Sequence, residues 1–263
     1  MQQILKYPRT HHIEGSKEQP GDEDLNCVPF SHLTNKYLVI EEKLDGSNSA
    51  VSFNDHGELR LQSRGHFLTG GPRERHFALF KTWGNTHFSA LHEVLSNRYI
   101  MFGEWLYAKH TIFYTHLPHY FMEFDIYDKV TELFLSTKAR KALLEPLSII
   151  QSVPVLFEGQ LESIEEMKAL VGPSNYIDQN HLAILREKAE KQNLNADKII
   201  FETDNSILME GLYIKVEQQV EVVERYKYVR GDFLTTVLNS QSHWLDRPII
   251  PNGLKEEVDL FTI

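Results

Sequence analysis

The chain has 263 residues, of which 41% are hydrophobic and 24% are charged. These proportions are close to the average for globular proteins, and they exclude a mainly disordered chain, a collagen and a coiled coil. The formal net charge of −10 excludes a surface that binds nucleic acid everywhere, so any polynucleotide must bind a local basic strip.

The first residues are mixed and polar, and we expect them to form a structured lead-in at 1–36. They lack the basic and then apolar layout of a signal peptide, and no later stretch approaches the roughly 20 apolar residues of a membrane span. Cys27 is the one cysteine of the chain, which agrees with a reducing compartment. We expect Cys27 to be a small buried residue and the protein to be cytoplasmic, with no membrane as a partner.

Short apolar runs separated by turn residues dominate the chain as far as residue 127. The turn residues at 54–57 join two such runs into a predicted hairpin. Apolar residues spaced three apart then predict an amphipathic helix over 72–83. Strands are predicted at 37–40, 50–53, 59–63, 99–102 and 120–127.

Helix-favouring residues dominate 137–200, with the clearest predicted helices at 162–170 and 181–193. Strand-like runs return at 212–216 and 221–229. No internal repeat or linker divides the chain. We therefore expect a single α+β domain built on antiparallel sheets.

Lys43 follows the first apolar strand and begins the sequence Lys-Leu-Asp-Gly. We expect a lysine in this place to face a cleft. Its amine becomes a nucleophile only after it loses a proton, and the carboxylates of Glu42 and Asp45 oppose the lowered pKa that this requires. Alone, these residues also fit an ordinary surface turn, so their interpretation depends on the motifs that follow.

Five further motifs follow the lysine motif in order: Ser63-Arg64-Gly65, Phe102-Gly103-Glu104-Trp105, Phe124-Asp125-Ile126-Tyr127, Glu210-Gly211-Leu212-Tyr213-Ile214-Lys215 and Arg225-Tyr226-Lys227. The whole series resembles the covalent lysine nucleotidyltransferases, which include polynucleotide ligases and mRNA capping enzymes. DNA ligases and capping enzymes usually place an arginine two residues after the glycine of the lysine motif. This chain has Asn48 there, so it looks closest to ATP-dependent RNA ligases of the nick-sealing type.

The resemblance implies a nucleotidyltransferase domain of the ATP-grasp-like ligase type, with antiparallel sheets flanked by helices. Only 33 residues follow Arg230, which is too few for a C-terminal oligonucleotide-binding barrel, so we expect none. The expected parts of this single adenylyltransferase domain, 1–263, are the lead-in at 1–36, a core at 37–230 with a helical insert at 137–200, and a C-terminal extension at 231–263.

The resemblance makes Lys43 the nucleophile that attacks the α-phosphate of ATP. This attack crowds negative charge around phosphorus, and cations fixed beforehand stabilise that charge. Lys215 and Lys227 are the predicted catalytic cations. Arg225 lies two residues from Lys227 on a predicted strand, so the two side chains share a face. Relatives usually have lysine where Arg225 stands, and arginine keeps the charge but is a poor proton donor.

The remaining roles are also implied by the resemblance. Glu104 binds the ribose hydroxyls, Phe124 stacks on adenine, and Glu210 helps to hold Mg²⁺ or Mn²⁺. Magnesium needs few carboxylates when phosphate oxygens and waters complete its shell. The residues assigned to the nucleotide are Glu42, Asp45, Arg64, Glu104, Phe124 and Arg225, and those assigned to the 5′-phosphate of a strand are Asn48 and Arg64.

The implied activity is an ATP-dependent RNA ligase that joins 3′-hydroxyl and 5′-phosphate ends through a lysyl-AMP intermediate and an adenylylated 5′ end. Its expected substrate is RNA or an RNA-containing nicked duplex, as in RNA repair, and a partner protein is one source for the missing substrate clamp. A DNA ligase or a capping guanylyltransferase is the enzymatic alternative, against which Asn48 argues. A non-catalytic nucleotide- or RNA-binding module is the alternative of another class, but binding alone does not require a nucleophilic Lys43.

Overall fold

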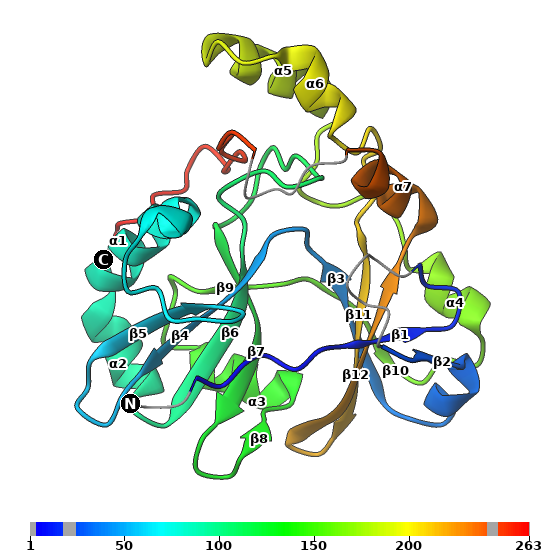
Figure 1. Cartoon of the computed structure of the whole chain (residues 1–263). Coiled ribbons are helices and arrows are strands. Elements are labelled where there is room, and N and C mark those ends of the chain that lie inside the picture. Colours follow the sequence, from blue (N-terminus) through cyan, green and yellow to red (C-terminus); the bar gives the residue numbers. More distant parts are fainter. Residues whose placement is uncertain (1–3, 18–24, 241–246, 263) are drawn as a thin grey trace.

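The computed structural model describes residues 4–17, 25–240 and 247–262. In these ranges the chain forms two six-stranded sheets with helices around them (Figure 1). Most neighbouring strands are antiparallel, so the predicted α+β class with antiparallel sheets and flanking helices is confirmed.

The first sheet has the order β10 (Val155–Gly159), β3 (Leu38–Lys43), β11 (Gly211–Gln218), β12 (Glu221–Val229), β1 (His11–Ile13) and β2 (Cys27–Val28). The second has the order β5 (Leu59–Ser63), β4 (Ser47–Phe53), β6 (Tyr99–Trp105), β7 (Phe121–Asp128) and β8 (Leu133–Phe134), with β9 (Gln151–Ser152) also paired to β7. The helices are α1 (Ala78–Thr86), α2 (Phe88–Leu95), α3 (Thr137–Leu144), α4 (Ile164–Ala169), α5 (His181–Lys191), α6 (Ala196–Phe201) and α7 (Gly231–Ser240), and the short 3₁₀ turns are Phe30–Leu33 and Pro72–Phe77.

The side chains of β3 alternate between two environments, because successive residues of a strand point to opposite faces. Ile40 belongs to the apolar core outside the first sheet, where Met167 of α4 also packs. Glu41 and Lys43 alternate with that core position and face the second sheet. The antiparallel register places Gly211 of β11 opposite Lys43. The inner face of the first sheet therefore gathers motif residues from different parts of the sequence.

The second sheet is covered on its outer side by α1 and α2, whose apolar residues form its core. Phe80 and Trp83 are fully buried there, as their spacing predicts. The predicted hairpin is confirmed as β4 and β5. The predicted helix over 72–83 begins as a tighter 3₁₀ turn, because the Glu74 carboxylate reaches back to accept the Gly70 amide and holds the chain in a turn before α1.

The structure adds strands in two segments where none was predicted, and one expectation about burial is wrong. The helical insert at 137–200 does contain α3 to α6, but it also contains β9 and β10, and β10 pairs with β3. The lead-in at 1–36 contains β1 and β2, which extend the first sheet beyond β12. Cys27 is exposed and not buried, because β2 is an edge strand and turns this side chain outward.

After β12 the described chain forms α7 and then a return segment, 247–262, without an oligonucleotide-binding barrel. The return segment packs on the loop between β6 and β7, where the Lys109 amide donates to the Ile250 carbonyl at 2.9 Å. The Arg247 guanidinium, in the return segment, donates to the His110 carbonyl of this loop and to Ser240 Oγ at the end of α7, each at 2.9 Å. In the described ranges, none of the helices has the length and apolar character that crossing a membrane requires.

Gly211→Ala is expected to lower the free energy of unfolding by more than about 2 kcal/mol. An added Cβ would lie 1.9 Å from the Tyr228 carbonyl oxygen, so β11 and β12 could not keep their register. Urea and thermal unfolding measure this. Gly172→Ala is the matched control, since no atom lies within 4 Å of the Cβ it would add. Equal stability of the two variants would contradict the close approach of the strands.

Candidate active site

A cleft of about 800 Å³ lies between the inner faces of the two sheets. It brings together most of the residues singled out from the sequence, although they are spread over almost the whole core. Those that line it are Glu42, Lys43, Asp45, Asn48, Arg64, Glu104, Phe124, Glu210 and Lys227. Lys215 and Arg225 are not among the residues that line it.

Lys43 stands at the end of β3 with its side chain in the cleft and 25% exposed. Its Nζ donates to Glu210 Oε1 at 2.5 Å. Burial alone would lower the pKa of the Lys43 amine, but the carboxylates of Glu210, Glu104 and Asp45 outweigh burial and raise that pKa above its ordinary value. In this state Lys43 therefore carries a proton, and a protonated amine cannot attack as a nucleophile.

The carboxyl groups of Glu104 and Glu210 flank the lysine from opposite sheets. Burial raises the pKa of Glu104 to about 8 and that of Glu210 to about 7, and the negative groups nearby add to both shifts. Burial also raises the pKa of Glu42, on the other face of β3, to about 7. A cation placed between the carboxyls of Glu104 and Glu210 would therefore be stabilised more than a cation at the protein surface.

The Glu210 carboxylate fits a divalent cation in one respect. Its Oε2 atom is buried and accepts no hydrogen bond among the described residues. No group of three or more potential protein ligands occurs in the described ranges, so the chain would supply few of the ligands itself. Mg²⁺ is commonly bound in this way, by one or two carboxylates together with water and phosphate oxygens.

Asp45 is fixed by the loop that follows β6. Its Oδ2 accepts the amide N–H groups of Thr111 and Ile112, each at 2.7 Å, and its own amide donates to the Tyr114 hydroxyl at 2.8 Å. His110 Nδ1 lies 3.9 Å from Asp45 Oδ1, and burial lowers the pKa of this histidine to about 4. His110 is therefore neutral, and Asp45 anchors the lysine motif to the second sheet.

Phe124 enters the cleft at a β-bulge. Along β6 and β7, Phe102 is paired with Asp125 and Gly103 with Glu123, so Phe124 is the extra residue between them. A bulge turns one side chain away from the alternating pattern of its strand. Phe124 therefore lines the cleft. The next residue, Asp125, also points inward, toward Lys215.

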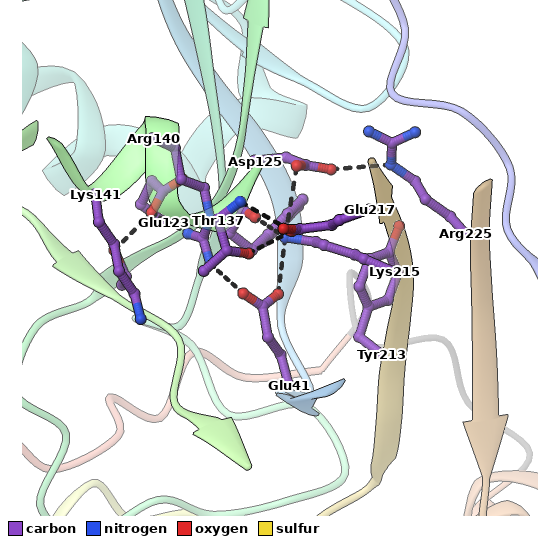
Figure 2. Close-up of polar contacts among 12 residues, drawn as sticks. Glu41, Glu123, Asp125, Thr137, Arg140, Lys141, Tyr213, Lys215, Glu217 and Arg225 are labelled. Atoms are coloured by element: carbon purple, nitrogen blue, oxygen red, sulfur yellow. Dashed lines mark hydrogen bonds and ion pairs between the residues drawn. The ribbon is translucent and has the colours of Figure 1, made fainter. Parts of the chain in front are cut away.

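Below the cleft, Lys215 is fully buried and joins the two sheets. Its Nζ lies 2.9 Å from Glu41 Oε2 and 3.5 Å from Asp125 Oδ1 (Figure 2). It also donates to the Phe124 carbonyl. The predicted role of Lys215 as a cation at the nucleotide phosphorus does not fit this placement. Lys215 neutralises buried carboxylates beneath the cleft, and this position favours a structural role.

Arg140 and Arg225 extend this buried network. Arg140 of α3 contacts Glu41 and, at 2.5 Å, Glu123, while Arg225 Nε lies 2.9 Å from Asp125 Oδ2 (Figure 2). The network thus joins three carboxylates to three cations: Glu41, Glu123 and Asp125 to Arg140, Lys215 and Arg225. Burial alone would raise the pKa of Asp125, but Arg225 and Lys215 outweigh it and lower that pKa. Arg225 shares the inner face of β12 with Lys227, as predicted, yet its charge is directed to Asp125.

Several cleft residues were not singled out from the sequence. Tyr7 and Thr10 come from the lead-in, and Phe233, Val237 and Arg247 come from the segments after β12. The sequence around Tyr7 has no periodic pattern, and none of the predicted motifs includes Thr10 or the cleft residues after β12. Their positions follow only from how the ends of the chain pack on the core.

The profile of the RNA ligase family matches residues 36–229, most of the chain and every motif in the cleft. The chain belongs to the RNA ligase family. This agrees with the resemblance that the motif order indicates. No curated protein sequence matches the chain.

Solved structures of Naegleria gruberi RNA ligase share the fold of this family member. A variant with ATP and Mn is 18% identical at a TM-score of 0.53, over 88% of this chain and 58% of that chain. A variant with AMP and Mn is 16% identical at a TM-score of 0.55, and the ligase with PPi is 19% identical at a TM-score of 0.53. Each match covers 88% of this chain and 57% of that chain. This chain thus spans a little over half the length of the solved chains, and identities this low establish the fold.

In this RNA ligase family member, Lys227→Ala is expected to slow labelling by α-labelled ATP about a hundredfold, because a cation in the cleft is lost. Its midpoint of thermal unfolding should change little.

Lys215→Met is expected to lower the free energy of unfolding by about 3 kcal/mol, since Glu41 and Asp125 then share fewer buried cations. A stable but inactive Lys215→Met would instead support the catalytic role predicted from the sequence.

Proposed function

We propose that this chain is an ATP-dependent RNA ligase that works through a lysyl-AMP intermediate on Lys43. The observation that carries the proposal is the contact of Lys43 with Glu210 inside a cleft that Glu104, Phe124 and Lys227 also line. Membership in the RNA ligase family supports it, and solved ligases of the same fold contain ATP, AMP and Mn.

In the first step the cleft holds ATP with its base against Phe124 and its ribose against Glu104. A divalent cation held by Glu210 and the phosphates would supply positive charge, which lowers the pKa of the Lys43 amine and neutralises the leaving group. The amine loses its proton to water, and Nζ attacks the α-phosphorus. A phosphorus–nitrogen bond forms, the bond to pyrophosphate breaks, and Lys227 stabilises the charge that develops.

In the second step a strand brings its 5′-phosphate to the lysyl-AMP. An oxygen of that phosphate attacks the AMP phosphorus, Lys43 leaves, and a 5′-adenylylated end forms. In the third step a 3′-hydroxyl loses its proton, attacks the 5′-phosphorus and releases AMP. Asn48 and Arg64 line the cleft and can donate to the 5′-phosphate.

The proposed substrate is RNA or an RNA-containing nicked duplex, and the proposed place is the cytoplasm. The chain is acidic overall, with a net charge of −10, so its own grip on a polynucleotide is limited to the cleft and its rim. A partner protein that binds the duplex is proposed as the clamp, and RNA repair as the setting.

Lys43→Ala is expected to abolish covalent labelling by α-labelled ATP in the presence of Mg²⁺ or Mn²⁺, because the attacking amine is removed. The measurement is radioactivity retained on the denatured protein, together with the labelled peptide. Lys141→Ala is the control, since that lysine is half exposed on α3. Labelling of the Lys43→Ala protein at another residue would show that the nucleophile has been misassigned.

Asn48→Ala is expected to keep Lys43 labelling but to lose transfer of AMP to a 5′-phosphorylated nick, because a neutral amide adds little charge at ATP but can donate to a strand phosphate. Transfer is followed on a nick with ribonucleotides on the 3′-hydroxyl side and on an all-DNA nick. Asn85→Ala, on the exposed side of α1, is the control. Normal sealing by Asn48→Ala, or better sealing of the all-DNA nick by wild type, would favour the DNA ligase alternative.

A further inference from the structure

The N-terminal segment at 4–13 lies outside the family match, yet it crosses from one sheet to the other (Figure 1). Near its start, Gln62 of the second sheet donates its side-chain N–H to the Leu5 carbonyl at 2.9 Å. At its end, β1 pairs in parallel with β12 and places His12 beside Lys227. The segment therefore runs along the floor of the cleft, and Tyr7 lies between its two attachments.

The hydroxyl of Tyr7 is held by polar groups from both sheets. It donates to Asp125 Oδ2 at 2.6 Å, lies 2.6 Å from the Tyr213 hydroxyl and accepts from Arg225 Nε at 3.1 Å. The side chain is only 4% exposed, and burial raises its pKa well above the ordinary value. Tyr7 thus keeps its proton, and its ring has one fixed position.

The ring of Tyr7 meets Phe124 edge to face. Their centroids are 5.1 Å apart and their planes form an angle of 78°, which is a favourable aromatic arrangement. On its other side Tyr7 packs on Phe102, with centroids 5.0 Å apart. The backbone of Phe124 is already fixed by the bulge and by Lys215. The orientation of its ring is then restrained by Tyr7 and, at a longer centroid distance of 6.1 Å, by Tyr213.

We propose that Tyr7 is a positioning residue for the nucleotide base, acting by holding the Phe124 ring ready to stack. The inference rests on the proposed function, in which Phe124 receives adenine. A ring fixed before binding loses less conformational entropy when the base arrives, so the expected effect is on ATP affinity and not on the chemical step. The segment that the family match leaves out thereby completes the nucleotide site.

The experiment compares variants of Tyr7 in the full chain by the ATP concentration that gives half-maximal labelling of Lys43 and by the maximal labelling rate. Tyr7→Leu removes the ring, so the half-maximal concentration should rise about three- to tenfold, with a maximal rate within about twofold of wild type. Tyr7→Phe keeps the ring but loses the hydroxyl contacts. It should lower the midpoint of thermal unfolding while leaving the half-maximal concentration within about twofold.

Two further variants separate positioning from general packing. Tyr127→Leu is the matched control, because Tyr127 packs on Phe134 in the same apolar cluster, at 5.0 Å, and should affect only stability. In a Phe124→Leu background, adding Tyr7→Leu should raise the half-maximal concentration no further, since coupled residues do not add. If Tyr7→Leu does not fold, Tyr7→Met carries the same comparison.

A wild-type half-maximal concentration for Tyr7→Leu, or additive effects of the Tyr7 and Phe124 changes, would overturn the inference. So would a loss of maximal rate at unchanged half-maximal concentration, which would indicate a role in the chemical step. Failure of the wild-type protein to be labelled by ATP would instead overturn the proposed function, so the two failures are distinguishable.

Discussion

One buried carboxylate, Glu41, holds the two sheets at a fixed distance, because two cations share it. Arg140 contacts Glu41 and Glu123, and Lys215 contacts Glu41 and Asp125, so the ion pairs run from the first sheet into the second. Removing one member would leave a buried charge without its partner, at a cost of about 3–5 kcal/mol. Lys43 stands on one wall of the cleft and the bulge at Phe124 on the other, so their separation depends on this network.

The sequence predicted the strands that carry their signal in local alternation or in short apolar runs between turns. Residues 212–216 and 221–229 are such cases, and both are strands in the fold. β10 could not be predicted in this way, because its five residues stand among helices and become a strand only by pairing with β3. The same applies to β1, which has three residues and depends on an edge formed by the other end of the core.

The cleft positions of Lys43 and Glu210 were predictable because the order of the motifs resembles that of a known family. Spacing does not specify whether a cation faces the cleft or the interior, and Lys215 is the example. Its side chain points to the inner face of β11, as strand alternation predicts. Its ammonium group, however, pairs with Glu41 and Asp125 beneath the cleft. Tyr7 shows the opposite limit, since its position depends on contacts more than a hundred residues away, with Asp125 and Tyr213.

The Arg247 contacts described above have a mechanical consequence. They fasten the end of α7, which continues the first sheet, to the His110 loop of the second, while Tyr7 fastens the two sheets at the opposite end of the cleft. Swinging the sheets apart as rigid bodies would break buried polar contacts at both ends. Widening the cleft therefore costs free energy at both of its ends, which favours the spacing of the two sheets seen here.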